Sequence, residues 1–136
     1  MRIWTDKALS VVKAAEVKAH AMNHAKLDPL HLLWAFLSKG SQMEKTAKAL
    51  DLEPDLVALA AEQELGRMPK DRHIEVSSPN DALRRLFLRA ADLAATSPVT
   101  RQEGRIGRRE LLLALTEDSG RAGALVRSFQ AAGDPA

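Results

Sequence analysis

The chain has 136 residues, enough for one domain with a buried core and too few for a second large domain. Apolar residues make up 46% and charged residues 28%, and no apolar run approaches the roughly 20 residues that cross a bilayer, which argues against a disordered tail or a membrane protein. The formal net charge of +2 does not indicate a dedicated nucleic-acid binder, and the absence of cysteine excludes disulfides and zinc-thiolate sites.

Composition also predicts the fold class and the location. Alanine and leucine supply 43 residues and aromatic side chains only 4%, which favours helices over sheets. The polar residues Thr5, Asp6 and Lys7 interrupt the N-terminus where a signal peptide would need an apolar core. We therefore expect a cytoplasmic, all-α protein.

The N-terminal third is predicted to hold two helices that differ in burial. Thr5 precedes apolar residues at helical spacing, so we expect it to cap a first helix from about residue 6 to 22. Asp28 and Pro29 give the cap and the first-turn proline of a second helix, about 29–38. The second segment is apolar nearly all round, which predicts a core helix buried on most sides. Its apolar residues are Leu30, Leu32, Leu33, Trp34, Ala35, Phe36 and Leu37.

Further helices are predicted on both sides of a charged segment. Ser41 is expected to cap a third helix, and Pro54 to open a fourth. Residues 67–78 hold a proline, many charges and a short alternating pattern, and are predicted to be an extended linker or an isolated strand. Ser78 and Pro79 then repeat the cap-plus-proline signal before three more helices. The apolar residues of these five helices include Met43, Ala47 and Leu50; Leu56, Leu59, Ala60 and Leu65; Leu83, Leu86, Ala90 and Leu93; Leu111, Leu112, Leu113 and Leu115; and Ala122, Leu125, Val126 and Phe129.

The two halves of the chain repeat one apolar pattern. Leu9 and Val12 of the first helix correspond to Leu83 and Leu86 at an offset of 74 residues. Later positions correspond at an offset of 79, so the first connection is predicted to be five residues longer in the second half. The pairs at this second offset are Leu27 and Ile106, Leu32 and Leu111, Leu33 and Leu112, Ala35 and Ala114, Ala47 and Val126, and Leu50 and Phe129.

The repeat predicts the architecture. We expect an all-α, pseudo-twofold double repeat of a four-helix unit, with about seven helices because the last helix of the second repeat is missing. The single domain, residues 1–136, divides into repeat one at 1–66, a linker at 67–78 and repeat two at 79–133. The seam between the halves is expected to offer apolar surface to a peptide.

The residues around the second helix carry a resemblance to a known family. Thr5 before an amphipathic helix, then His24 and the run Leu-Asp-Pro-Leu-His-Leu-Leu-Trp-Ala-Phe-Leu from Leu27 to Leu37, is similar to the double Clp repeat at the N-terminus of Clp ATPases, most of all to the ClpB disaggregase branch. A second copy from Ile106 to Leu115 falls in the family's order. The resemblance therefore covers essentially the whole chain.

The resemblance implies a chaperone function in the stress response. The chain would be a mobile substrate-recognition or adaptor-docking domain that binds unfolded or aggregated polypeptides weakly and works with Clp ATPase modules in cis. It implies a peptide-binding site at Trp4, Thr5, Asp81 and Leu83. We expect no catalytic residue, metal, cofactor, membrane contact or nucleic-acid partner. The alternative is a stand-alone regulatory protein of Clp repeats that docks on a Clp ATPase or on another partner.

Phosphoarginine recognition, which the resemblance associates with the ClpC branch, is not expected. That branch places a glutamate directly before the histidine of the motif in both repeats, whereas Leu30 and Arg109 stand at those positions here. A leucine cannot pair with a guanidinium group and an arginine repels it.

The histidines favour structural roles over catalytic or metal-binding ones. His20 and His24 have the i, i+4 spacing that holds a metal on a helix, but no third ligand accompanies them. His31 lies in the apolar second helix, so we expect it to pack or to bond to the backbone rather than to act as a general base. The sequence has no Gly-x-x-x-x-Gly-Lys-Ser/Thr loop and so predicts no nucleotide binding of the Walker kind.

Two roles stay open for several other residues. Thr5 either only caps the first helix or also handles substrate, and Trp4 either packs as a staple on that helix or anchors a client. The cluster of Arg84, Arg85 and Arg89 is either a solvated face or a contact for an acidic or nucleic-acid partner.

Overall fold

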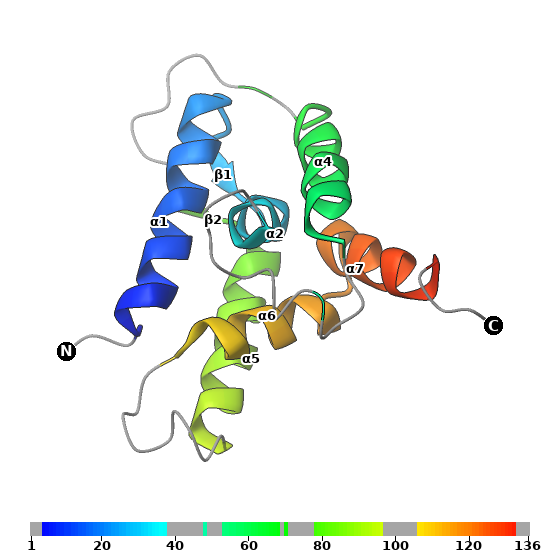
Figure 1. The fold of residues 1–136 in the computed structure, drawn as a ribbon. Coiled ribbons are helices and arrows are strands. Elements are labelled where there is room, and N and C mark those ends of the chain that lie inside the picture. The colour runs from blue at the N-terminus through cyan, green and yellow to red at the C-terminus, as the bar shows by residue number, and fades with distance from the viewer. Residues whose placement is uncertain are drawn as a thin grey trace.

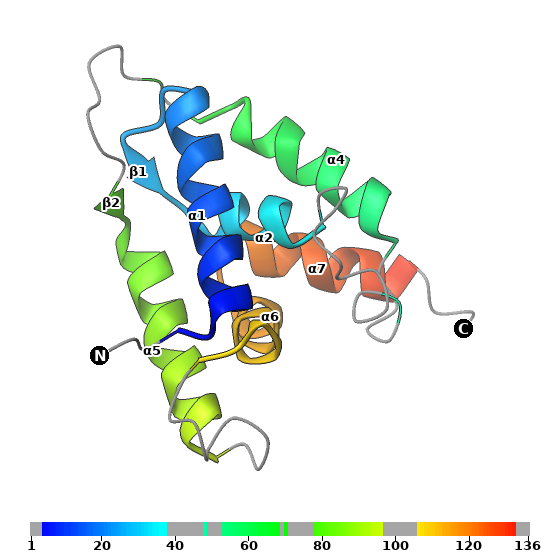
Figure 2. The same cartoon turned by 60° about the vertical axis from the view of Figure 1, so that its left-hand side comes forward.

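Six helices and one pair of very short strands make up the part of the chain that the computed structural model describes, residues 4–37, 48, 53–68, 70, 78–96 and 106–132. The α2 helix lies in the middle of the molecule, and the other helices surround it (Figures 1 and 2). This arrangement confirms the all-α fold class. The elements are α1 Asp6–Ala21, β1 Lys26–Leu27, α2 Pro29–Leu37, α4 Pro54–Leu65, β2 Ser78–Pro79, α5 Asp81–Thr96, α6 Arg108–Glu117 and α7 Arg121–Ala132.

The predicted helices that fall on described residues are present, with bounds close to those expected. The third helix, predicted after Ser41 with Met43, Ala47 and Leu50, lies outside the described residues, as does the alternating pattern at 74–76. None of the helices described is both long enough and apolar enough to cross a membrane.

The α2 helix is the centre of the core, as its sequence predicts. Leu33 is 0% exposed, and Leu112, at the corresponding place in α6, is 1% exposed. Trp34 is the one side chain of α2 that is only half-buried. The ammonium group of Lys18, on α1, lies 4.3 Å from the centre of the Trp34 ring and 2.5 Å from the Glu62 carboxylate on α4. Lys18 therefore ties three helices together at the edge of the core.

The cap of α5 differs from the prediction. Ser78 and Pro79 form the strand β2, which pairs in parallel with β1, and the cap is Asn80. The Asn80 side-chain oxygen accepts a hydrogen bond from the Leu83 backbone N–H at 2.8 Å, and its amide donates to the Asp28 carboxylate at 2.7 Å. Asp28 in turn accepts from the Leu30 N–H at 2.8 Å, so the caps of α2 and α5 are bonded to each other.

Two equivalent backbone hydrogen bonds connect the two repeats. The Asn80 N–H donates to the Leu27 carbonyl at 2.9 Å, and the Thr5 N–H donates to the Ile106 carbonyl at 3.0 Å. In each hydrogen bond, the donor is the residue that caps the first helix of one repeat. The acceptor lies shortly before the second helix of the other repeat. The contacts are therefore equivalent under a twofold relation between the halves.

These contacts correct the offset between the first helices. Thr5 and Asn80, both caps, are 75 residues apart, and the helices that follow each begin one residue later. The buried positions Ala8, Val11, Ala15 and Ala19 of α1 correspond at the same spacing to Leu83, Leu86, Ala90 and Ala94 of α5. The predicted offset of 74 is wrong because it paired half-buried Leu9, rather than the small buried Ala8, with Leu83; the first connection is four residues longer, not five.

Candidate functional site

The residues before α1 pack across the seam between the repeats. Trp4 forms a parallel bridge with Ile106, and its ring meets the Phe87 ring of α5 edge-on, with centroids 4.9 Å apart and an interplanar angle of 71°. Both aromatic side chains are half-buried, so part of each ring faces solvent. Trp4 therefore packs on α5, and its role as an anchor for a client stays a prediction.

Thr5 caps α1, as predicted. Its hydroxyl oxygen accepts a hydrogen bond from the Ala8 backbone N–H at 3.2 Å, and Asp6 follows in the first turn, where a negative charge favours the helix dipole. The side chain is half-buried. Its role in handling substrate stays a prediction.

The other two predicted site residues lie in different environments. Asp81, the first residue of α5, is exposed and pairs with Arg84 at 3.3 Å. Leu83 is 0% exposed, so its side chain offers no surface to a peptide in this structure; the predicted binding role of this residue stays a prediction. Leu83 lies on the face of α5 that packs into the core, where its side chain contributes to stability.

The adjacent residues Trp4 and Thr5 lie beside Phe87 of α5, and Asp81 lies at the start of that helix. Phe87 is six residues after Asp81, about 9 Å further along the helix axis at 1.5 Å per residue. Sequence reasoning missed Phe87, which completes the apolar pattern of α5 one position after Leu86 and corresponds to Val12 at the offset of 75. We call the contact of Trp4, Thr5, Phe87 and Ile106 the seam site.

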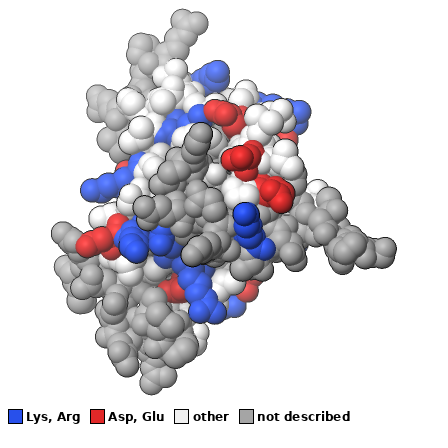
Figure 3. Space-filling model, in the orientation of Figure 1, with Lys and Arg blue, Asp and Glu red and all other residues white. Residues whose placement is uncertain are grey.

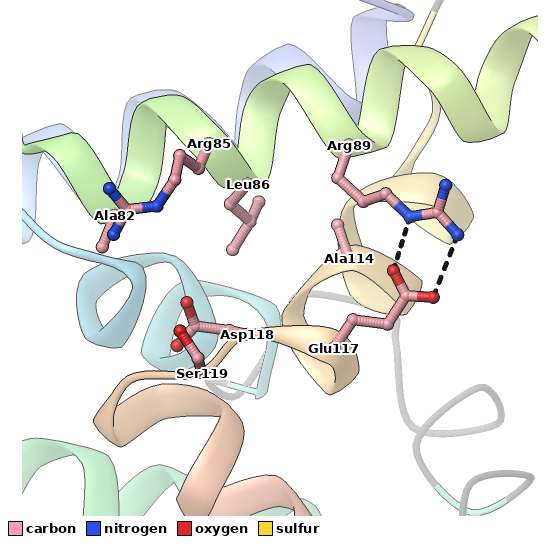
Figure 4. Close-up of a pocket in the computed structure, with 8 residues that line it drawn as sticks. All are labelled: Ala82, Arg85, Leu86, Arg89, Ala114, Glu117, Asp118 and Ser119. Atoms are coloured by element: carbon pink, nitrogen blue, oxygen red, sulfur yellow. Dashed lines mark hydrogen bonds and ion pairs between the residues drawn. The ribbon is translucent and has the colours of Figure 1, made fainter.

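A cleft of about 250 Å³ opens on another face of α5, between this helix and the junction of α6 with α7. Figure 4 shows the side chains of α5 on one wall, with the end of α6 and the start of the next turn on the other. Its floor is apolar and its rim is charged. The lining residues are Ala82, Arg85, Leu86 and Arg89 of α5, with Ala114, Glu117, Asp118 and Ser119 opposite.

Two of the three clustered arginines of α5 form ion pairs with carboxylates. Arg89 forms a two-pronged pair with Glu117, at 2.6 and 3.2 Å, which holds the pKa of that carboxyl below its usual range. Arg84 pairs with Asp81. Basic and acidic side chains are interspersed over the described part of the face seen in Figure 3. This face therefore does not show the one-sign patch that favours a polyanion.

Two buried histidines face each other behind the start of α2. His24 Nδ1 and His31 Nε2 are 2.8 Å apart, and His31 Nδ1 accepts a hydrogen bond from the Asp28 N–H at 2.9 Å. Burial, together with the neighbouring His24, lowers the pKa of His31 to about 4. The pKa of His24 is also lowered, mainly by burial. Both imidazoles are therefore neutral near pH 7, and the predicted backbone bond of His31 is confirmed.

The structure removes the geometric basis for a metal on His20 and His24. The α1 helix ends at Ala21, and the chain turns at Asn23, which has a φ of 59°. His24 thus lies beyond the helix and is buried against His31, while His20 is exposed. Within the described residues no group of three histidine, aspartate or glutamate side chains could hold a metal ion.

Comparison with known proteins assigns most of this chain to one family. Residues 3–129 match the family described as the Clp repeat (R) N-terminal domain. This match covers both repeats, from before α1 into α7. No curated protein gives a significant sequence match.

Solved structures show the same fold. The N-terminal domain of Hsp104 from Candida albicans aligns over 96% of this chain and 88% of its own, with a TM-score of 0.70 and 21% identity. A chain from structural investigations of a malarial protein secretion system aligns over 93% of this chain and 82% of its own, with a TM-score of 0.69 and 18% identity. At these identities the likeness establishes the fold.

Proposed function

Because the chain belongs to the Clp repeat N-terminal domain family, we propose that it recognises unfolded polypeptide, or an adaptor that carries it, for a ClpB-like protein-unfolding ATPase. The observation that carries the proposal is the family match over 3–129, since it includes both repeats and the seam between them. The similar fold of the Hsp104 N-terminal domain supports the ClpB-like assignment.

We place polypeptide binding at the seam site. Half-buried aromatic rings such as Trp4 and Phe87 provide apolar contact area at low entropic cost, and unfolded chains expose the apolar side chains that such rings bind. The contact is small, so each binding event should be weak and rapidly reversible. Weak binding suits a domain that must pass its client to a motor.

The proposal gives this chain no catalytic step. ATP hydrolysis would belong to ATPase modules outside it, and the domain would need no cofactor or metal. We propose a cytoplasmic location, where such a domain would meet unfolded and aggregated chains.

The test is a fluorescence titration with a permanently unfolded, reduced and alkylated polypeptide. Trp34→Phe leaves Trp4 as the sole tryptophan, so its emission reports directly on the seam site. We expect the emission to change saturably with the unfolded polypeptide and not with the same polypeptide in its native form.

A variant and a control sharpen the result. Trp4→Ala should weaken binding by about tenfold or more, as expected for an aromatic anchor at the centre of the contact. Leu59→Ala, which shortens an exposed apolar side chain on α4, should leave the affinity unchanged. Absence of binding at millimolar polypeptide in the unaltered protein would overturn the proposal.

A further inference from the structure

The cleft beside α5 is separate from the seam site on the same helix. Ala82, Arg85, Leu86 and Arg89 recur at i, i+3, i+4 and i+7, so they form a single stripe along α5 that faces the cleft. Phe87, which contacts Trp4, lies outside this stripe. One helix thus supports two different surfaces.

The acidic groups of the cleft are already occupied. The Glu117 carboxylate is bound by Arg89. One oxygen of Asp118 accepts hydrogen bonds from the backbone N–H groups of Gly120 and Gly123, at 3.0 and 3.2 Å, where α7 begins. The charge of Glu117 is therefore paired with a cation of the protein itself, whereas Asp118 is hydrogen-bonded as the cap of α7.

Arg85 is the one arginine of the cleft that has no carboxylate partner among the described residues. Within the residues that the structure describes, its guanidinium group makes no hydrogen bond or ion pair, although it is exposed on the cleft wall (Figure 4). The neighbouring Arg84 and Arg89 both have carboxylate partners. The cleft consequently offers one free, bidentate donor for an anion.

The floor of the cleft determines which kind of group can bind next to that anion. Leu86 and Ala114 line the cleft although they are only 4% and 2% exposed, and Ala82 is half-buried, so the apolar surface beside Arg85 is small. A volume of about 250 Å³ is below the range of about 300–1,000 Å³ that holds whole small-molecule ligands, and it suits one or two side chains of a peptide.

We propose that this cleft binds an acidic segment of a partner protein, in which an aspartate or glutamate pairs with Arg85 and an adjacent small apolar side chain lies on the floor. A nucleic acid fits less well, because its affinity rests on many phosphate contacts and the cleft offers only one arginine without a carboxylate partner among the described residues. The inference rests on the proposed protein-recognition function, to which it adds a second site and the chemistry of its partner.

The experiment uses two fluorescent twelve-residue peptides and the whole chain. One peptide alternates glutamate with alanine and leucine, and the other carries glutamine in place of each glutamate. We expect the acidic peptide to bind at least about tenfold more tightly, because a charged hydrogen bond is lost with the amide, and to weaken as salt is added. Equal affinity of the two peptides, or tighter binding of an oligonucleotide of equal length, would overturn the inference.

Variants of two adjacent arginines localise the effect. Arg85→Gln should reduce affinity for the acidic peptide by about tenfold or more, whereas Arg84→Gln, whose partner is Asp81, should reduce it by less than about twofold. Both side chains are exposed, so unchanged thermal unfolding would show that both variants fold. Equal losses in the two variants would contradict a specific role for Arg85.

The experiments distinguish a failure of the cleft inference from a failure of the proposed function. Arg85→Gln should keep its affinity for unfolded polypeptide, and Trp4→Ala should keep its affinity for the acidic peptide. If only the acidic peptide fails to bind the unaltered protein, the cleft inference is wrong; if neither ligand binds, the proposed function is wrong as well.

Discussion

His31 and Glu110 occupy the same place in α2 and α6, and each accepts a hydrogen bond from a backbone N–H group three residues earlier. His31 Nδ1 accepts from Asp28 at 2.9 Å, and the Glu110 carboxylate accepts from Gly107 at 3.2 Å. Both side chains are buried, at 0% and 2% exposure. Two chemically different residues thus bind an otherwise unpaired N–H group at the start of each central helix.

The histidine makes the stability of the first repeat depend on pH. Unfolded histidine gains a proton near pH 6.5, whereas folded His31 does so only near pH 4. Because the unfolded state binds more protons between these values, the free energy of unfolding should be fully retained above pH 6.5. It should fall by up to about 1.4 kcal/mol per pH unit as the pH is lowered toward 4. His24, whose pKa is also lowered, adds a loss of the same sign.

Urea unfolding at several pH values measures this effect. His31→Asn keeps an acceptor for the Asp28 N–H but cannot take up a proton, so its unfolding free energy should vary less steeply over the same pH interval. An identical slope in both proteins would show that His31 does not contribute.

Gly123 should not tolerate a side chain. A Cβ atom at this position would overlap the backbone carbonyl of Asp118, so Gly123→Ala should lower the free energy of unfolding by about 1–3 kcal/mol. Gly66 is the matched control, because its φ of −63° is helical and a Cβ atom there would lie 3.4 Å from the nearest atom. Gly66→Ala should be neutral or stabilise by up to about 1 kcal/mol. Thermal unfolding of both variants tests the difference, and equal effects would contradict it.

The two central helices should dominate stability. Truncating Leu33 or Leu112 to alanine removes a buried side chain and leaves a cavity, at an expected cost of about 2–5 kcal/mol. Leu59→Ala, at a residue that is 54% exposed, should cost less than about 0.5 kcal/mol. Denaturant midpoints provide the comparison. A harmless Leu33→Ala would mean that the core lies elsewhere.

Substitutions of Thr5 test whether this residue only caps α1 or also binds polypeptide. Its hydroxyl is already used by the Ala8 N–H, so Thr5→Ala should cost about 0.5–2 kcal/mol of stability while affinity for unfolded polypeptide changes by less than about twofold. Thr5→Ser retains the cap and should resemble the unaltered protein. Loss of binding at unchanged stability would instead assign Thr5 to the contact with polypeptide.

Local sequence signals predicted the helices and the core well. Thr5 is a cap because a short polar side chain precedes an apolar periodic stretch, and Leu33 is buried because its helix is apolar all round. The expected backbone bond of His31 follows from the same reasoning, since a polar group in such a helix needs a partner.

Features that depend on contacts between distant segments could not be predicted in the same way. Asn80 is the cap of α5 because β2 pairs with β1 and so ends the extended segment at Pro79. Phe87 joins the seam site only because Trp4 is held against Ile106, and α4 exposes Leu56 and Leu59 while burying Val57. None of these pairings has a signal in the local pattern.

The seam site is tested most directly by an amide-resolved NMR titration of the isotopically labelled chain with unfolded polypeptide. We expect the largest chemical-shift changes at the Trp4 indole, the Thr5 and Ile106 amides and the α5 amides around Phe87, with the start of α4 unaffected. The largest changes around Leu56 and Leu59 on α4, or no change at millimolar polypeptide, would contradict it.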